Sequence, residues 1–165
     1  MNKKEWLDHI YYGVGKQQYD FLVCGLFKDN EGNTRSTKWK KYSEVCFGLD
    51  PHEDYMIKWV NQRQILPTEI VLDIEEKGNL NDIIEKLKSF NIGNFIIYDT
   101  GSRGYHVHIF SKFPVLKPIK EFLISKFGAD MVKSGKKTMI ALENCPHWKT
   151  GVNKTMVKKY EEGFE

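Results

Sequence analysis

The chain has 165 residues, of which 41% are hydrophobic, and a formal net charge of +3, values that suit one folded domain or one domain with a small appendage. It contains no run of 18 apolar residues, which excludes a membrane span, and its first residues, MNKKEWLDHIYYG, lack the apolar stretch of a secretory signal. We therefore expect a cytoplasmic location. Because Cys24, Cys46 and Cys145 form no C-x-x-C pair, we expect buried free thiols, and neither a disulfide framework nor structural zinc.

The first 65 residues predict an α/β unit. A helix is expected over residues 3–13, followed by an apolar strand, YDFLVCGLF, and a turn, KDNEGN. A basic segment comes next, and a second helix is expected over about residues 52–64. Leu66 and Pro67 then break the chain.

From residue 66 onward the sequence predicts an RRM-like unit. Residues 68–143 follow the order β-α-β-β-α-β, which is the split-βαβ, ferredoxin-like arrangement of an α+β fold. Its four antiparallel strands are expected in the spatial order 4-1-3-2, with the first and third strands central. We expect one domain over residues 1–165, in which the α/β unit of residues 1–65 packs beside the sheet of residues 66–165. The expected elements are the strand EIVLDIE, the helix NLNDIIEKLKSFNIG, the strands NFIIYD and YHVHIF, the helix KPIKEFLISKFG and the strand TMIALE, with KTMVKKYE as a candidate further strand.

This topology brings distant segments to one sheet edge. The first strand ends near Asp73, and the third begins at Tyr105 and His106 and runs antiparallel beside it. The loop before the fourth strand carries Asp130 and is expected at the same edge. We therefore expect Asp73, His106 and Asp130 to lie close together.

Asp73 and Glu75 are separated by one residue, which puts both carboxylates on one face of a strand. Two adjacent carboxylates repel each other, so one becomes protonated unless a cation lies between them. A hard divalent ion such as Mg²⁺ or Mn²⁺ prefers these oxygen ligands. Asp130 is the expected third ligand and Glu143 the alternative; a merely polar strand end would need no metal.

His106 and His108 also share one face of their strand. Such a pair can hold a transition metal, or one imidazole can donate to a phosphate. The preceding turn, TGSRG, supplies backbone N–H groups, the Thr100 and Ser102 hydroxyls and the Arg103 guanidinium, which together suit a polyphosphate. An ordinary hairpin loop with incidental histidines is the alternative.

A second candidate phosphate site follows the strand TMIALE. In LENCPHWKTG, the side chains of His147, Lys149 and Thr150 are donors on a turn that ends at Gly151. A phosphate contact and a plain surface turn are both compatible with this segment.

Basic residues gather in two segments and lie among aromatic residues. This mixture is typical of a groove for a polyanion such as nucleic acid, although a solvated surface is the alternative. The residues are Arg35, Lys38, Lys40 and Lys41 around Trp39 and Tyr42, and Lys133, Lys136, Lys137, Lys149, Lys154, Lys158 and Lys159 in the last third.

Taken together, these motifs resemble those of the archaeo-eukaryotic primases, which are the primase small subunits and the primase-polymerases. Asp73 and Glu75 in VLDIEE match the family's acidic pair, in the D-x-E form that resembles plasmid primase-polymerases. TGSRGYHVHI matches the motif S-G-x-R-G-x-H before an apolar strand, with Arg103 and His106 in register and Thr100 in place of serine.

The remaining motifs extend the resemblance over roughly residues 65–155. Asp130 matches the third-motif aspartate and lies 17 residues before His147, and HWKTG matches the family's basic H-x-K-T-G turn. Ala141 occupies the position at which cellular primases often carry a nucleotide-binding lysine, for which Lys137 or Lys149 is the candidate substitute.

The resemblance implies a metal-dependent nucleotidyltransferase, a DNA primase or primase-polymerase that makes or extends primers on single-stranded DNA from NTPs or dNTPs. It implies that Asp73, Glu75 and Asp130 hold Mg²⁺ or Mn²⁺. A large primase subunit or a helicase is a candidate partner. The implied nucleotide-binding residues are Thr100, Ser102, Arg103, His106, His147 and Lys149.

Two other functions fit parts of the sequence. An HUH-type replication-initiation endonuclease would use the histidine pair for a metal and Tyr160 as nucleophile. A non-catalytic nucleic-acid or nucleotide-binding module would share the β-α-β-β-α-β order, but an RRM displays aromatic residues on its central strands. The strands here display Asp73, Glu75, His106 and His108 instead.

Overall fold

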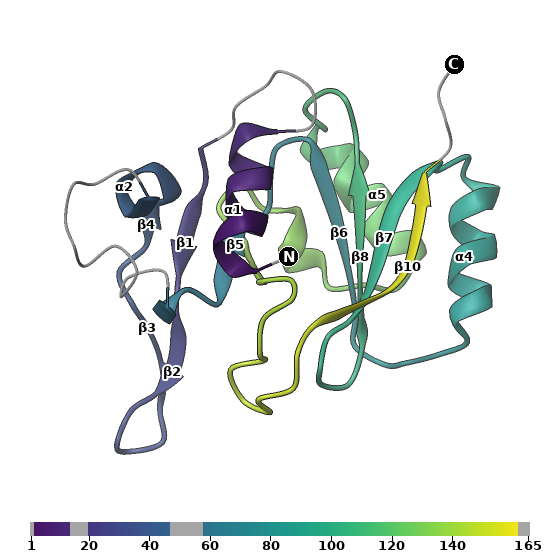
Figure 1. Ribbon diagram of the computed structural model, residues 1–165. Helices are drawn as coiled ribbons and strands as arrows, with labels where there is room; N and C mark the ends of the chain where they lie inside the picture. Colours follow the sequence, from purple (N-terminus) through teal and green to yellow (C-terminus); the bar gives the residue numbers. More distant parts are fainter. Residues whose placement is uncertain (1, 14–19, 47–57, 162–165) are drawn as a thin grey trace. The chain divides into compact units, whose positions relative to one another are not determined.

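The computed structural model describes residues 2–13, 20–46 and 58–161, and it divides the chain into two compact units (Figure 1). The first unit comprises Met1–Gln64 and Met139–Lys154, and the second comprises Ile65–Thr138 and Thr155–Glu165. Both combine helices with antiparallel strands, which confirms the α+β class. The first unit includes residues 139–154, which were expected in the RRM-like unit of residues 66–165. No described helix has the length and apolarity needed to cross a membrane.

The first unit is built around a four-stranded antiparallel sheet. The strand order is β4-β1-β5-β9, and β2 and β3 form a separate hairpin. The elements are α1 (Lys3–Tyr12), β1 (Leu22–Cys24), β2 (Leu26–Lys28), β3 (Thr34–Ser36), β4 (Lys40–Lys41), α2 (Tyr42–Cys46), β5 (Gln62–Gln64) and β9 (Met139–Ala141).

Two predictions for the first unit need correction. The apolar strand YDFLVCGLF is divided at Gly25, where a Cβ would lie 2.1 Å from the Trp59 carbonyl oxygen, so only glycine fits this close approach. The predicted helix over 52–64 begins outside the described residues, and its last part is wrong because Gln62–Gln64 forms β5. Tertiary contacts override helix propensity there, since the Arg63 side chain pairs with a distant carboxylate.

The cysteine prediction is confirmed for two of the three residues. Cys24 and Cys145 are buried free thiols, and burial raises the pKa of each. The side chain of Cys46 lies outside the described part of the structure.

The second unit contains the predicted strand–helix–strand–strand–helix series. Its sheet has the order β10-β7-β8-β6, and each neighbouring pair is antiparallel. β6 and β7 are therefore parallel with β8 between them, which confirms the split-βαβ arrangement. The elements are β6 (Glu69–Ile74), α4 (Leu80–Ser89), β7 (Asn94–Asp99), β8 (Tyr105–Phe110), α5 (Lys117–Lys126), the 3₁₀ helix η1 (Met131–Ser134) and β10 (Thr155–Glu161).

The predicted strand order 4-1-3-2 is wrong for the fourth strand, TMIALE, which was expected beside the first. TMIALE does form a strand, β9, but β9 pairs with β5 in the first unit. β10 takes the free place beside β7, so β7 and β8 are central and β6 lies at the edge. Alternating apolar residues predict a strand, but they do not specify which strand it pairs with.

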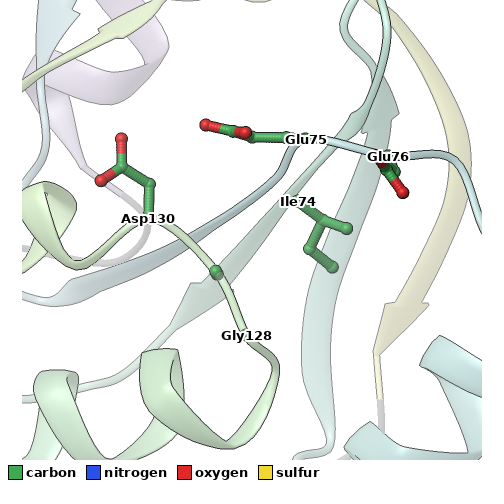
Figure 2. Close-up of a pocket in the computed structure, with 6 residues that line it drawn as sticks. Ile74, Glu75, Glu76, Gly128 and Asp130 are labelled. Carbon is green, nitrogen blue, oxygen red and sulfur yellow. The ribbon is translucent and has the colours of Figure 1, made fainter.

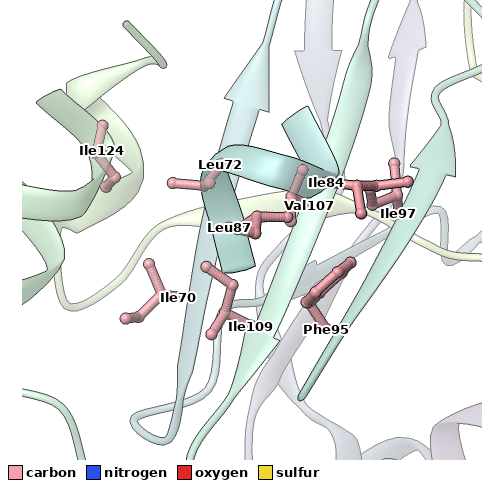
Figure 3. Packing of buried hydrophobic residues seen from close by; sticks show 9 residues of the cluster. All are labelled: Ile70, Leu72, Ile84, Leu87, Phe95, Ile97, Val107, Ile109 and Ile124. Carbon is pink, nitrogen blue, oxygen red and sulfur yellow. The ribbon is translucent and has the colours of Figure 1, made fainter. Parts of the chain in front are cut away.

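One face of the second sheet packs against α4 and α5 (Figure 3). Ile84 and Leu87 of α4 and Ile124 of α5 cover inward-facing residues of the strands, including Leu72 and Val107, which are fully buried. Side chains alternate across a strand, so Asp73 and His106, which follow Leu72 and precede Val107, lie on the opposite face. The packing of the core therefore determines which face carries the candidate site.

Candidate functional site

An acidic pocket lies at the end of β6 in the second unit. It is lined by Ile74, Glu75, Glu76, Gly128, Ala129 and Asp130. Figure 2 shows the Glu75 carboxylate reaching across the pocket toward Asp130, whereas the Glu76 carboxylate points away. Asp73 lies beside it, because the Asp130 backbone N–H donates to the Asp73 carbonyl oxygen over 3.1 Å. The structure therefore brings Asp73, Glu75 and Asp130 to one region, as the sequence predicts.

Asp130 reaches this pocket by a different route from the predicted one. It follows α5, whose end is marked by Gly128 at a φ of +60°, a left-handed conformation that favours glycine. Asp130 is also the N-cap of η1, and its side chain accepts a hydrogen bond from the Val132 N–H over 3.0 Å. The turn after α5, rather than a loop leading into a fourth strand beside β6, places this carboxylate.

The donor set of the pocket fits a hard divalent cation. Glu75 is exposed, and Asp73 and Asp130 are partly exposed, so carboxylate oxygens line an accessible surface. In the described part of the chain, the three carboxylates do not gather within 4.8 Å of one another. A bound Mg²⁺ or Mn²⁺ would draw them together and offset their mutual repulsion.

His106 lies directly beside the acidic residues. It pairs with Asp73 across β8 and β6, and its Nε2 atom is 3.4 Å from Asp73 Oδ1. The ring is buried, so any charge that it carries is felt strongly by Asp73. This histidine connects the predicted metal-binding carboxylates to the neighbouring turn.

His108 has a different partner from His106. Its Nδ1 atom lies 2.6 Å from Glu69 Oε2, and both side chains are completely buried. The other Glu69 oxygen accepts from the Leu66 N–H over 3.0 Å. Lys120 lies near this pair: burial lowers its pKa, and the Glu69 charge partly opposes that effect. His108 therefore faces the buried Glu69 carboxylate, whereas His106 faces Asp73.

The turn between β7 and β8 is held by its own hydrogen bonds. The Thr100 hydroxyl oxygen accepts from the N–H groups of Ser102 and Gly104 over 3.1 and 3.4 Å. Asp99 Oδ1 accepts from the Gly101 N–H over 2.9 Å. Thr100 is buried and shapes the turn, whereas the Ser102 and Arg103 side chains are exposed. Of the predicted phosphate donors on this turn, Ser102 and Arg103 are the accessible ones.

The turn HWKTG lies in the first unit. His147 Nδ1 accepts a hydrogen bond from the Lys149 N–H over 3.1 Å, which leaves the ring proton on Nε2. Burial and, to a smaller extent, the Lys149 charge lower the pKa of His147. Lys149 also lies over the Trp148 ring at 5.1 Å from its centroid. The turn thus presents a neutral imidazole donor and an ammonium.

A buried ionic cluster in the first unit was not anticipated from the sequence. Arg63 contacts Glu143 through two nitrogens, at 2.5 and 3.1 Å, and the Trp6 Nε1–H donates to the same carboxylate over 2.7 Å. The Lys154 ammonium donates to the Ala141 carbonyl oxygen over 2.9 Å and lies 3.9 Å from Glu143. Arg63 and Glu143 are 80 residues apart, so no local pattern could have paired them.

The contacts of this cluster help to choose between Glu143 and Asp130, the two candidates for the third metal-binding carboxylate. Glu143 is fully buried and engaged by Arg63, whereas Asp130 lines the pocket beside Glu75. The lysine beside position 141 is Lys154, which is also buried. Asp130 is therefore the better candidate of the two.

Comparison with known proteins gives a match at the level of fold. No family model and no curated protein sequence matches this chain. Among solved structures, the AEP domain of the cyanophage S-2L primase-polymerase (PrimPol) is similar, with a TM-score of 0.64 and 15% sequence identity. The similarity covers 99% of this chain and 94% of that domain. The chain thus has the α+β fold of a primase-polymerase AEP domain.

Proposed function

We propose that this protein is a metal-dependent nucleotidyltransferase that makes or extends primers on single-stranded DNA from NTPs or dNTPs. The proposal rests on one observation: Asp73, Glu75 and Asp130 lie in one region at the end of β6, beside His106. The likeness to a primase-polymerase AEP domain supports the same reaction class through its fold.

The three carboxylates are the proposed ligands of Mg²⁺ or Mn²⁺. When bound there, the metal would activate a 3′-hydroxyl and neutralise the leaving pyrophosphate. Asp73 also faces His106, so the carboxylate and the imidazole orient each other. This arrangement keeps His106 next to the position that the triphosphate would occupy.

The triphosphate is the proposed ligand of the exposed turn residues. Arg103 and Ser102 supply donors from the β7–β8 turn, and His106 supplies one from the start of β8. His147 and Lys149 are proposed to add a neutral and a charged donor. Thr100 is proposed to act by holding this turn with its hydroxyl oxygen rather than by contacting a phosphate itself.

The HUH-type endonuclease is less well supported by these contacts. The His108 imidazole is buried against Glu69, although the endonuclease would need it as a metal ligand beside His106. Tyr160 stacks on Phe95, a core residue, whereas His106 lies on the other sheet face. The proposed nucleophile and the proposed metal pair are therefore on opposite faces.

The test is primer synthesis on single-stranded DNA with labelled nucleotides and Mn²⁺ or Mg²⁺, together with Mn²⁺ binding followed by electron paramagnetic resonance. Asp73→Ala should abolish product and weaken Mn²⁺ binding while leaving the fold intact. Glu75→Gln should lower both more strongly than Glu76→Gln, because the Glu76 carboxylate points away from Asp130 (Figure 2).

Two results would overturn the proposal. Undiminished product from Asp73→Ala would end the catalytic interpretation. Nucleotide and DNA binding without any synthesis by the wild-type protein would favour a non-catalytic binding module of the same fold.

A further inference from the structure

A row of large apolar side chains is exposed at the start of α5. Phe113, Leu116, Ile119 and Phe122 have exposed fractions of 71%, 69%, 51% and 52%. They follow one another at intervals of three residues, from the loop before the helix into its second turn. We call these four residues the α5 patch.

The α5 patch lies on a side of the helix that the core does not use. The inward side of α5 carries Ile124, which is fully buried in the core, and Lys120, whose ammonium contacts the Leu66 carbonyl oxygen. On a helix with 3.6 residues per turn, Ile119 and Phe122 point away from these positions. Exposed apolar side chains that are grouped in this way are more typical of interaction sites than of ordinary solvent-exposed surface.

The charges around the α5 patch indicate the chemistry of its partner. Lys112, next to Phe113 in the sequence, and Lys126, whose ammonium lies over the Phe122 ring, are exposed. Lys117 and Glu121, the one acidic residue of the segment, lie 3.8 Å apart on the other side of the helix. A basic border around an apolar centre complements a partner with acidic and apolar side chains. A second copy of the chain fits poorly, because a two-fold contact would bring the same lysines together.

Phe122, one of the two aromatic rings of the α5 patch, is poorly arranged for stacking on bases. The Lys126 ammonium lies over the Phe122 ring at 5.3 Å from its centroid, and Phe90 meets the same ring edge to face at 6.3 Å. Single-stranded nucleic acid needs open aromatic faces, which Leu116 and Ile119 cannot provide. These contacts favour a protein partner over a nucleic acid.

We propose that the α5 patch binds an acidic amphipathic helix of a partner protein. The apolar face of that helix would cover Leu116, Ile119 and Phe122, and its carboxylates would face Lys112 and Lys126. Such a partner would present its apolar residues at helical spacing, as amphipathic helices do in protein complexes. The site does not depend on nucleotidyl transfer, so a failure of either proposal leaves the other standing.

The test uses a displayed library of random peptides about 15 residues long, roughly four helical turns. The library is selected on the wild-type protein alone, and the selected peptides are then tested on the double variant Ile119→Ser/Phe122→Ser. The surviving peptides should be rich in Asp and Glu and carry Leu, Ile, Phe or Trp at intervals of three and four. The matched control is Met156→Ser/Val157→Ser, which removes two exposed apolar side chains from β10.

A selected peptide is then labelled and its affinity measured by fluorescence anisotropy. Ile119→Ser/Phe122→Ser should weaken binding at least tenfold, and Lys112→Glu/Lys126→Glu should weaken it severalfold and reduce its salt dependence. The β10 control should bind like the wild type. Urea unfolding of each variant checks that the fold is retained, and Leu116→Ser replaces the double variant if that one unfolds.

Three outcomes would overturn the proposal. The selected peptides could bind the double variant as well as the wild type, or they could be basic rather than acidic. Oligo(dT) could displace the peptide, which would make the surface a nucleic-acid platform. Ultracentrifugation could show a dimer that Ile119→Ser/Phe122→Ser disrupts, which would make the occupant a second copy.

Discussion

At the scale of single residues, Gly104 shows how closely the strands of the candidate site approach. A Cβ at this position would lie 1.9 Å from the Ile74 carbonyl oxygen and 2.9 Å from the Glu75 backbone. Ile74 and Glu75 both line the acidic pocket. The absence of a side chain at position 104 thus allows β8 to begin against the end of β6.

We predict that Gly104→Ala destabilises the protein by about 1–3 kcal/mol, because the added methyl group meets backbone that cannot move out of its way. The free energy of unfolding in urea measures the effect. Gly78→Ala is the matched control: no atom lies within 4 Å of its Cβ, so its effect should stay within about 0.5 kcal/mol. Equal stability of the two variants would show that β8 and β6 can separate freely.

His147 allows a prediction about pH. Its pKa is lowered from 6.5, first by burial and then by the Lys149 charge. A lowered pKa means that the unfolded chain binds a proton before the folded one as the pH falls. The contribution of this group to stability is therefore present above pH 6.5 and is lost as the pH falls toward the pKa of the folded state.

We expect an NMR titration of the His147 ring to show a midpoint below 6.5, with the proton on Nε2 in the neutral form. Lys149→Gln removes the neighbouring charge and should raise that midpoint while the Lys149 backbone N–H still donates to Nδ1. A wild-type midpoint at or above 6.5 would contradict the burial of this ring.

At the scale of elements, helices and strands with a regular pattern of apolar residues could be predicted, but the pairing between strands could not. Leu80, Ile83, Ile84 and Leu87 follow helical spacing, and α4 forms there with Asn79 as its N-cap. β9 was expected as a strand and is one, but its place beside β5 depends on a register of Gln62 with Ala141. Pairings over such separations are determined by tertiary contacts that local patterns do not encode.

The candidate site could likewise be predicted where its features are local in the sequence, but not where they depend on contacts between distant residues. The spacing of Asp73 and Glu75 and the turn before His106 are local features, and both are placed as expected. The partner of His108 is Glu69, which no motif indicates, and the partner of Glu143 is Arg63. Because buried ion pairs join distant segments, the sequence alone could not exclude Glu143 as a metal ligand.

Glu143 and Asp130, the two candidates for the third metal-binding carboxylate, belong to different units and should respond differently to substitution. Glu143→Gln removes the negative charge that faces the Arg63 guanidinium inside the first unit, and breaking a buried pair typically destabilises by about 3–5 kcal/mol. Asp130→Asn keeps an N-cap on η1, so it should cost less than about 1 kcal/mol of stability. Urea unfolding measures both variants.

Mn²⁺ binding completes this comparison. Asp130→Asn should weaken Mn²⁺ binding, because it removes a carboxylate from the acidic pocket, while folded Glu143→Gln should bind Mn²⁺ like the wild type. Normal Mn²⁺ affinity in Asp130→Asn, combined with a loss in Glu143→Gln, would assign the third ligand to Glu143 instead.

At the scale of the whole molecule, charge limits how tightly the protein can hold a nucleic-acid template. The net charge of +3 is small, although lysines concentrate in the last third of the chain. Among them, Lys136 and Lys137 are exposed and follow η1, the element that begins at Asp130. We therefore expect template contacts near the acidic pocket of the second unit, where these lysines would offset the charge of the carboxylates.

We predict that single-stranded DNA alone binds with a dissociation constant that is micromolar or weaker in order of magnitude. Each neutralised phosphate changes the slope of log K against log[salt] by about 0.7 for a single strand, so binding should fade at moderate salt. Lys136→Ser/Lys137→Ser should reduce the slope by up to about 1.4, whereas the control Lys112→Ser/Lys117→Ser should leave it unchanged. Mn²⁺ with a complementary nucleotide should tighten binding, because the metal screens Asp73 and Glu75 and the incoming base pairs with the template. Anisotropy titrations over a salt series measure these quantities, and salt-insensitive binding or indifference to the complementary nucleotide would count against a templated active site.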